Sequence, residues 1–489
     1  MAIPAWYITR IPAPPIIPVT KILRLALLAT SSLLAACAGT PPQTPPSTEA
    51  PLSVYVILGE EGAPQARAIT AAASCPAITV DGRTLAMTPR AQPATIAQRP
   101  VNNPPEDAKA SAFPVLTCEA ALPRQAASAS IAGQALPLPK AAPQRIVVIG
   151  DTGCRLLKKE GSYQNCNFAG EYPFVKVAEL AAAWHPDLVV HVGDYHYRES
   201  PCPADRPGCA GTPWGYGWDA WQADFFAPGA ALLKAAPWVV ARGNHESCLR
   251  AGQGWWRFLD PRALQAGRDC NREADDDLGN YSDPYAIPLG QDTQLLVLDT
   301  ANTSWHGFQP SDVAWEKYRA NYRQLDALSR RAPHNLVLMH HPLLALGADT
   351  DKSSGNMFII KGDLGLQQSF GSLNPALFPA GVQTVLSGHV HLWEQISFAS
   401  DHPSQLVAGF SGTAEDIVPV PMPPPPGVTP APGAAIEHIS LWQDGFGYMT
   451  MERQGVEQWH IEVHDLQGRV RNRCRVDGRH SACEQLLVR

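Results

Sequence analysis

Seven side chains of metal-ligand type are spread through the middle of the chain, each shortly after an apolar run. They are Asp151, Asp194, Tyr197, Asn244, His340, His389 and His391. Together they offer carboxylate, phenolate, amide and imidazole groups, which suit a pair of hard or borderline metal ions. Two metal ions about 3.5–4 Å apart can stabilise both the attacking and the leaving oxygen at phosphorus. Each residue alone has an ordinary explanation as a turn former or packing residue, but the set predicts two-metal chemistry on phosphate esters.

The apolar runs before these residues have the length and composition of buried strands. Six such runs lie at 145–149, 186–192, 236–242, 293–299, 335–339 and 382–386. Residues 174–184 show the spacing of apolar side chains that is typical of a helix. Alternating strands and helices predict a layered α/β domain. Ligands of such domains bind at the carboxyl ends of the strands, which is where the seven side chains fall.

The regions before and after these runs have a different pattern. At 51–142, short apolar runs broken by Pro and Gly predict a small all-β, sandwich-like N-terminal domain. Its Ala- and Pro-rich composition leaves partial disorder as the alternative. Residues 418–432 carry a Pro-rich insertion that we expect to be a surface loop, and 436–476 return to strand-like alternation that would complete a β layer. The catalytic domain is therefore expected at 143–489.

The first residues of the chain have the features of an export signal. Lys21 and Arg24 precede an apolar segment at 25–34, which is too short to span a bilayer comfortably. The segment ends in Leu34-Ala35-Ala36-Cys37, which resembles a bacterial lipobox. This resemblance implies a signal peptide at 1–37, with Cys37 as the lipidated first residue of the mature protein.

Ordinary cleavage near Ala35 or Ala36 is the alternative to lipidation. Residues 38–50 are rich in Pro and predict an extended tether, which suits a lipid anchor. The sequence thus predicts an exported protein in the periplasm, or a lipoprotein at the outer membrane or cell surface. Contact with a membrane is expected only through the N-terminal anchor.

The composition and the cysteines narrow the function further. A formal net charge of −7 argues against a nucleic-acid-binding surface. Ten cysteines remain after Cys37, and an even number in an exported chain favours disulfides over a thiolate metal site. Proximity in sequence suggests the pairs Cys75–Cys118, Cys154–Cys166, Cys202–Cys209, Cys248–Cys270 and Cys474–Cys483.

Five short motifs in this region resemble the calcineurin-like metallophosphoesterases, and among them the purple acid phosphatases. The motifs are Gly150-Asp151-Thr152-Gly153, Gly193-Asp194-Tyr195-His196-Tyr197, Gly243-Asn244-His245-Glu246, Val337-Leu338-Met339-His340 and Gly388-His389-Val390-His391. Tyr197 stands where the purple enzymes carry a tyrosine that binds iron, and Gly153 stands where most other relatives have a histidine. The resemblance implies a four-layer α/β/β/α sandwich for the catalytic domain.

The resemblance also implies a role for each predicted ligand. Asp151, Asp194, Tyr197 and His391 would hold Fe(III), and Asp194, Asn244, His340 and His389 would hold a divalent Fe, Zn or Mn ion. Hydrolysis of a small phosphomonoester would follow in-line attack by a metal-bound hydroxide, as in an acid phosphatase. His245 would donate a proton to the leaving group or a hydrogen bond to the phosphate, or it would only orient Asn244.

Several questions stay open at this point. The same site could serve a phosphodiesterase or a nucleotidase, could hold Mn or Zn at both positions, or could belong to a surface binding protein without activity. His341 could cap the site. Four further side chains could face the substrate phosphate or be occupied elsewhere: Arg155, His196, Arg198 and Arg242. Trp- and Gly-rich loops at 213–218 and 254–256 could stack on a leaving group or simply pack.

Overall fold

A computed structural model describes residues 49–351, 353–419, 421–442 and 444–488. The predicted signal peptide at 1–37 and nearly all of the tether at 38–50 lie outside these residues. No helix in the described part of the chain is long and apolar enough to cross a membrane.

The first large sheet has eleven strands. In sheet order they are β28 (His480–Cys483), β27 (Val470–Asp477), β26 (Gln458–Asp465), β25 (Gly447–Arg453), β11 (Arg145–Ile149), β14 (Leu188–His191), β15 (Trp238–Val240), β1 (Ser53–Leu58), β2 (Pro64–Thr70), β8 (Leu116–Ala121) and β5 (Thr88–Ala91). The central strands β11, β14 and β15 are parallel, and β25 runs antiparallel to β11. The strand-like segment 436–476 thus supplies strands to this layer, as predicted.

The second large sheet has eight strands. In sheet order they are β16 (Tyr285–Gly290), β17 (Thr293–Val297), β18 (His334–Leu338), β21 (Val382–Ser387), β23 (Ser404–Ala408), β22 (Trp393–Phe398), β24 (Ile436–Trp442) and β29 (Leu487–Val488). Strands β17, β18, β21 and β23 are parallel. Parallel strands of both sheets therefore present their carboxyl ends as a group.

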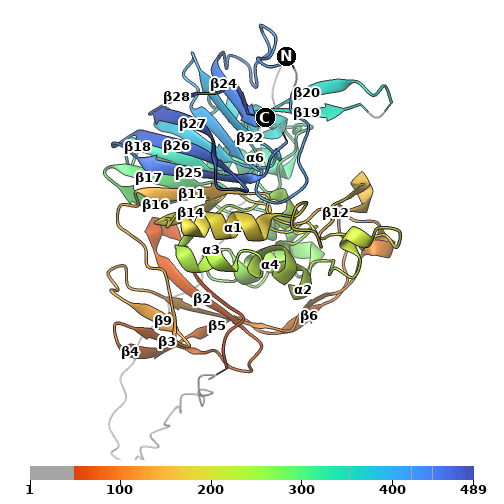
Figure 1. Ribbon diagram of the computed structural model, residues 1–489, viewed down its shortest axis with the longest axis vertical. Helices are drawn as coiled ribbons and strands as arrows, with labels where there is room; N and C mark the ends of the chain where they lie inside the picture. The colour runs from red at the N-terminus through yellow and green to blue at the C-terminus, as the bar shows by residue number, and fades with distance from the viewer. Residues whose placement is uncertain (1–48, 352, 420, 443, 489) are drawn as a thin grey trace, which may run out of the picture. The chain divides into compact units, whose positions relative to one another are not determined.

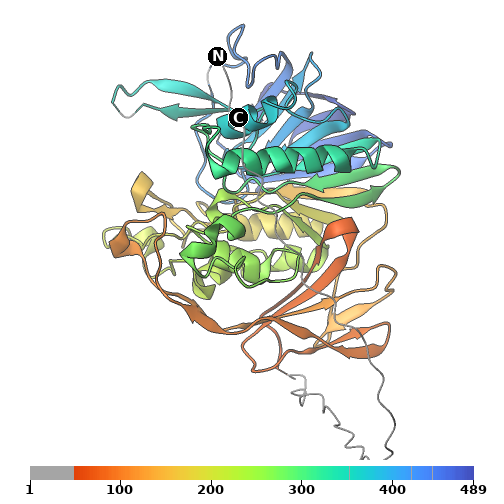
Figure 2. The same ribbon diagram turned by 180° about the vertical axis from the view of Figure 1, so that it is seen from behind.

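Helices cover the outer faces of both sheets (Figures 1 and 2). The helices on the first sheet are α1 (Phe174–Ala183), α2 (Trp218–Trp221), α3 (Ala230–Ala235) and α4 (Gly252–Phe258). Those on the second sheet are α6 (Val313–Ser329) and α7 (Leu364–Gly371). The short helix α5 (Asp276–Gly279) lies in a connection. The predicted four-layer α/β/β/α arrangement is confirmed.

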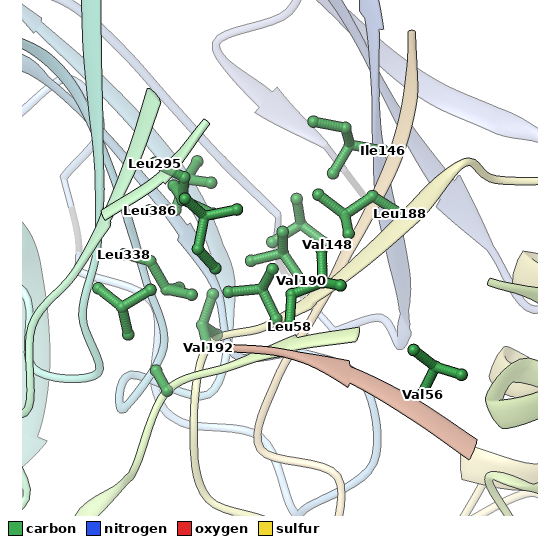
Figure 3. Close-up of a cluster of buried hydrophobic side chains, with 14 of the residues drawn as sticks. Val56, Leu58, Ile146, Val148, Leu188, Val190, Val192, Leu295, Leu338 and Leu386 are labelled. Carbon is green, nitrogen blue, oxygen red and sulfur yellow. The ribbon is translucent and has the colours of Figure 1, made fainter. Parts of the chain in front are cut away.

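The core between the two sheets explains why the central strands are continuous apolar runs. Ile146 and Val148 of β11 point between the sheets, toward Leu338 and Leu386 of the second sheet (Figure 3). The intervening residue Val147 packs on the helix side of the same strand. A strand that is buried on both faces needs apolar side chains at every position.

The remaining strands form smaller sheets. A four-stranded sheet contains β10 (Gln134–Ala135), β9 (Ala129–Ile131), β3 (Ala77–Val80) and β4 (Arg83–Ala86). Three two-stranded ribbons are β6 (Ala94–Ile96) with β7 (Ser111–Phe113), β12 (Leu156–Leu157) with β13 (Ser162–Tyr163), and β19 (Leu346–Thr350) with β20 (Met357–Lys361). All five disulfides pair as predicted.

The segment 51–142 is rich in strands, and four of them continue the first large sheet. Strand β1 pairs in parallel with β15 through Ile57 and Trp238. The buried Arg67 of β2 donates hydrogen bonds to the carbonyl oxygens of Phe258 (2.7 Å) and Asp260 (2.6 Å), at the end of α4. The boundary between two domains at 142/143 stays a prediction.

We expect Arg67→Met to lower the free energy of unfolding by about 2–4 kcal/mol, because it removes two charge-assisted hydrogen bonds in a buried position. Arg83→Met, at an exposed position of β4, is the matched control and should change it by less than about 0.5 kcal/mol. Denaturant unfolding of both variants tests this. If Arg67→Met and Arg83→Met unfolded at the same denaturant concentration, the hydrogen bonds of Arg67 to the end of α4 would not stabilise the fold.

Candidate metal centre

The carboxyl ends of parallel strands from both sheets bring the predicted ligands together. Asp151 follows β11 and Asp194 follows β14, and the N–H of Asp151 donates to the carbonyl of Gly193 (3.0 Å). In the second sheet, the N–H of Gly388 donates to the carbonyl of His340 (3.0 Å), which joins the loops after β18 and β21. The two sheets meet at the site, where His340 Nε2 lies 3.1 Å from Asp194 Oδ2.

Tyr197 is the centre of a first group of four buried side chains. Its Oη lies 2.8 Å from Asp151 Oδ1 and 2.9 Å from Asp194 Oδ2. The same oxygen lies 3.0 Å from His391 Nε2. Burial raises the pKa of Tyr197 well above its ordinary value, and the Asp151 and Asp194 carboxylates raise it further. The phenolate form therefore requires a nearby cation.

Asn244 is the centre of a second group. Its amide oxygen lies 3.0 Å from His340 Nε2 and 3.0 Å from His389 Nδ1. With the amide reversed, the NH2 group would occupy this place and would also lie 3.2 Å from Asp194 Oδ2. An amide oxygen among these acceptor atoms is stable only if a cation lies between them, whereas the reversed amide satisfies them with its own hydrogens.

The two groups share Asp194 and fit two metal ions. The ligand atoms of Asp151, Asp194 and His340 all lie within 4.8 Å of one another, as do those of His340, His341 and His389. Three of the four ligand atoms in the Tyr197 group are oxygens, whereas the Asn244 group has two oxygens and two imidazole nitrogens. This difference suits a hard ion beside a borderline one.

Neighbouring groups fix which nitrogen of two histidines faces the site. His340 Nδ1 lies 2.9 Å from the carbonyl oxygen of Val192, so that Nδ1 carries the proton and Nε2 is left to bind. The carboxylate of Asp416 accepts a hydrogen bond from the backbone N–H of His391 (2.9 Å). Its other oxygen lies 3.4 Å from the ring nitrogen Nδ1 of the same histidine. Partners of this kind orient metal-binding imidazoles.

Two buried carboxylates hold the ligand loops in place. Glu246 accepts hydrogen bonds from the backbone N–H groups of Asp194 (3.2 Å), Tyr195 (2.9 Å), His196 (3.2 Å) and Gly243 (3.1 Å). Asp224 accepts from the N–H groups of Tyr197 (2.7 Å) and Cys154 (3.0 Å). The motif around Asn244 includes Glu246, but no pattern in the sequence marks Asp224 or Asp416.

The side chain of His245 is buried beside the Tyr197 group, and its ring centroid lies 3.8 Å from that of Tyr197. Its Nδ1 lies 2.6 Å from Glu199 Oε1, and Arg250 Nε donates to the same oxygen (2.8 Å). Burial and the Arg250 charge lower the pKa of His245 to about 4. Sequence reasoning did not identify Glu199 or Arg250, although Glu199 follows Tyr197 by only two residues.

Three of the seven predicted ligands have left-handed backbone conformations. Asp151 has φ = 54°, Asp194 has φ = 57° and His389 has φ = 70°. Such a conformation costs a residue with a side chain about 1–3 kcal/mol, and residues of this kind gather at functional sites. The strain at three ligands indicates that the backbone is shaped for this site rather than for stability.

The other candidates have structural contacts. His341 lies against the ring of His389, with 4.2 Å between centroids, and its Nδ1 lies 3.2 Å from Thr300 Oγ1. Trp218, Trp255 and Trp256 of the Trp- and Gly-rich loops are buried, whereas Trp214 is half-buried, with Lys109 Nζ 4.3 Å from its ring centroid. The three buried rings pack the loops and are not available to stack on a leaving group.

Two solved structures are similar to the chain. A solved purple acid phosphatase, PPD1 from yellow lupin (Lupinus luteus) seeds, has a TM-score of 0.51 and 14% identity, covering 89% of this chain and 74% of that one. The structure of PhoD has a TM-score of 0.46 and 12% identity, covering 91% and 92%. No curated protein sequence matches the chain significantly.

The family model of the calcineurin-like phosphoesterases matches residues 144–392, about half of the chain. The matched segment contains all seven predicted ligands and the parallel strands that carry them. With the lupin structure, this match establishes the fold, and the fold implies two metal ions. The chain therefore belongs to the calcineurin-like phosphoesterase family.

Proposed function

We propose that the protein is a phosphomonoesterase of the purple acid phosphatase type. The observation that carries the proposal is the position of Tyr197, whose Oη lies within 3.0 Å of a ligand atom of each of three other residues in its group. A tyrosine in this place supplies a phenolate, a hard ligand that favours a trivalent ion.

In this proposal each group of side chains holds one ion. Asp151, Asp194, Tyr197 and His391 would hold Fe(III), and Asp194, Asn244, His340 and His389 would hold a divalent Fe, Zn or Mn ion. When bound, such a pair lowers the pKa of water and neutralises charge on a phosphate group that is displaced in line. The protein's own contribution is to hold the ligands rigidly and to orient the substrate.

His245 is the proposed catalytic residue among the groups that are not ligands. Its Nδ1 is held by Glu199, and its Nε2 lies 3.8 Å from Asp194 Oδ2, so Nε2 is the nitrogen on the side of the ligands. Burial lowers the pKa of His245 to about 4, and in the neutral ring the proton on Nδ1 faces Glu199, so that Nε2 carries no hydrogen. In acid the protonated ring has a hydrogen on Nε2 and would donate it to the leaving oxygen, or donate a hydrogen bond to the phosphate.

Five disulfides indicate that the protein is exported and folds outside the cytoplasm. Lipid anchoring through Cys37, at the outer membrane or cell surface, is part of the proposal. We expect the wild type to sediment with membranes after cell fractionation and a Cys37→Ser variant to be released. Release of both would support ordinary signal-peptide cleavage into the periplasm.

We expect the purified protein to be violet and to contain iron, because a phenolate bound to Fe(III) absorbs visible light. A Tyr197→Phe variant should lose the absorption band while it retains the fold. Visible spectra and metal analysis of both proteins test this. A colourless wild type that holds Mn or Zn would keep the two-metal site but remove the protein from the purple enzymes.

Replacing Asp194 by Asn should lower hydrolysis of a phosphomonoester by more than about 100-fold, since even an outer partner of a metal ligand contributes about 10- to 100-fold. Asp205→Asn, at an exposed position, is the matched control and should be fully active.

The same assay on a phosphodiester and on a nucleotide separates the alternatives. Preferred hydrolysis of simple monoesters supports the proposal, whereas preferred hydrolysis of diesters or nucleotides supports a phosphodiesterase or nucleotidase. A wild type without hydrolysis of any of these would indicate a binding protein.

A further inference from the structure

Four side chains near the ligand motifs could contribute a positive charge to substrate binding, and the structure shows that three are occupied. His196 Nε2 is 2.8 Å from the carbonyl oxygen of Gly215. Arg198 is buried in an ion pair with Asp224. Arg242 is the third occupied side chain, and Arg155 is the fourth candidate.

Arg242 is also occupied. Its Nη2 forms an ion pair with Asp299 (2.7 Å), and its Nη1 donates to the carbonyl of Gly279 (2.6 Å). Its side chain is 1% exposed, so that no substrate reaches it.

Arg155 differs from these three. Its guanidinium carbon lies 5.6 Å from the centroid of the Tyr197 ring, next to the first group of ligands. It interacts electrostatically with His391 and with Asp416, the carboxylate that orients His391. Its side chain is 15% exposed, and its Nε is buried without a hydrogen-bond partner among the described residues. Its one ion pair, with Glu160 at 3.4 Å, is to a half-exposed carboxylate.

The backbone at Arg155 is held firmly on both sides. The Cys154–Cys166 disulfide closes the loop, and the Arg155 N–H donates to Gln164 Oε1 (2.9 Å). Gln164 in turn donates to the carbonyl of Gly412 (2.9 Å). Because the backbone of this loop is fixed, only the Arg155 side chain loses entropy when the guanidinium binds an anion.

We propose that Arg155 binds the phosphate group of the substrate beside the Tyr197 group of ligands. The proposal rests on the proposed function and names the residue that would recognise the anion. A planar guanidinium presents parallel N–H donors that match two oxygens of one phosphate. A guanidinium at this position also adds positive charge to a site that contains the carboxylates of Asp151, Asp194 and Asp416, which favours the approach of a dianion.

The test compares Arg155→Gln and Arg155→Lys with the wild-type holoenzyme. We expect Arg155→Gln to raise both KM for a phosphomonoester and the inhibition constant of inorganic phosphate by about 10- to 100-fold, because a charge-assisted pair of hydrogen bonds is lost. Arg155→Lys should recover part of the lost affinity, since it restores the positive charge but not the pair of parallel N–H donors. Metal content and melting temperature should equal those of the wild type.

Glu160→Gln is the matched control, because it breaks the same ion pair and leaves the guanidinium in place. Its KM and phosphate inhibition constant should equal those of the wild type or fall below them. An unchanged KM and inhibition constant in Arg155→Gln, or an equal rise in Glu160→Gln, would overturn the assignment. Loss of metal from Arg155→Gln would overturn it too, since the residue would then support the ligands. None of these outcomes would contradict the proposed function, which depends on hydrolysis of phosphomonoesters by the wild-type protein.

Discussion

Asp151 and Asp194 are buried side by side, with 0% and 1% of their surfaces exposed. Buried carboxylates are stable only when positive charge or several donors surround them, because losing water costs each of them several kcal/mol. Backbone groups supply some of these donors: the backbone N–H of His389 donates to Asp151 Oδ2 (3.1 Å), and the backbone N–H of His245 donates to Asp194 Oδ1 (2.9 Å). Metal ions would supply the rest. The left-handed ligand backbones and the loop-binding carboxylates of Glu246 and Asp224 serve this one requirement.

The side chains that meet at the site could be predicted from the sequence because of where strands end. Each predicted ligand follows an apolar run closely, and parallel strands place such residues at one edge without further information. Asp224 and Asp416 escaped notice for the opposite reason. Asp224 lies in a short π-helix (Gln222–Phe226) and Asp416 in a loop, and a single carboxylate that accepts backbone hydrogen bonds leaves no periodic signal in either place. Glu199 lies close to a motif, but only the fold brings it within 2.6 Å of His245.

Strand content was predictable for residues 51–142, but their pairing was not. The bridge between Ile57 and Trp238 joins residues far apart in the chain, and no local pattern encodes such a partner. The burial of Arg67 was not predictable either, because arginine is rarely buried without a partner and is therefore expected at the surface. Its partners are carbonyl groups at the end of α4 and the carboxylate of Glu119 on β8, which only the folded chain brings together. The five cysteine pairs were easier, because four of them are close in sequence and the last follows by elimination.

Two disulfides also bear on which metals the protein accepts. Cys154 and Cys248 follow Asp151 and Asn244 by three and four residues, and both are in disulfides. In a reduced chain these thiolates would compete with the oxygen and imidazole ligands, and thiolates prefer zinc and copper(I) to hard ions. Closing the two bridges leaves neither cysteine with a thiolate and so removes both from the competition. A cysteine can bind a metal ion as a thiolate only while it is reduced, so the order of disulfide formation and metal uptake decides whether these two sulfurs can take part in the competition.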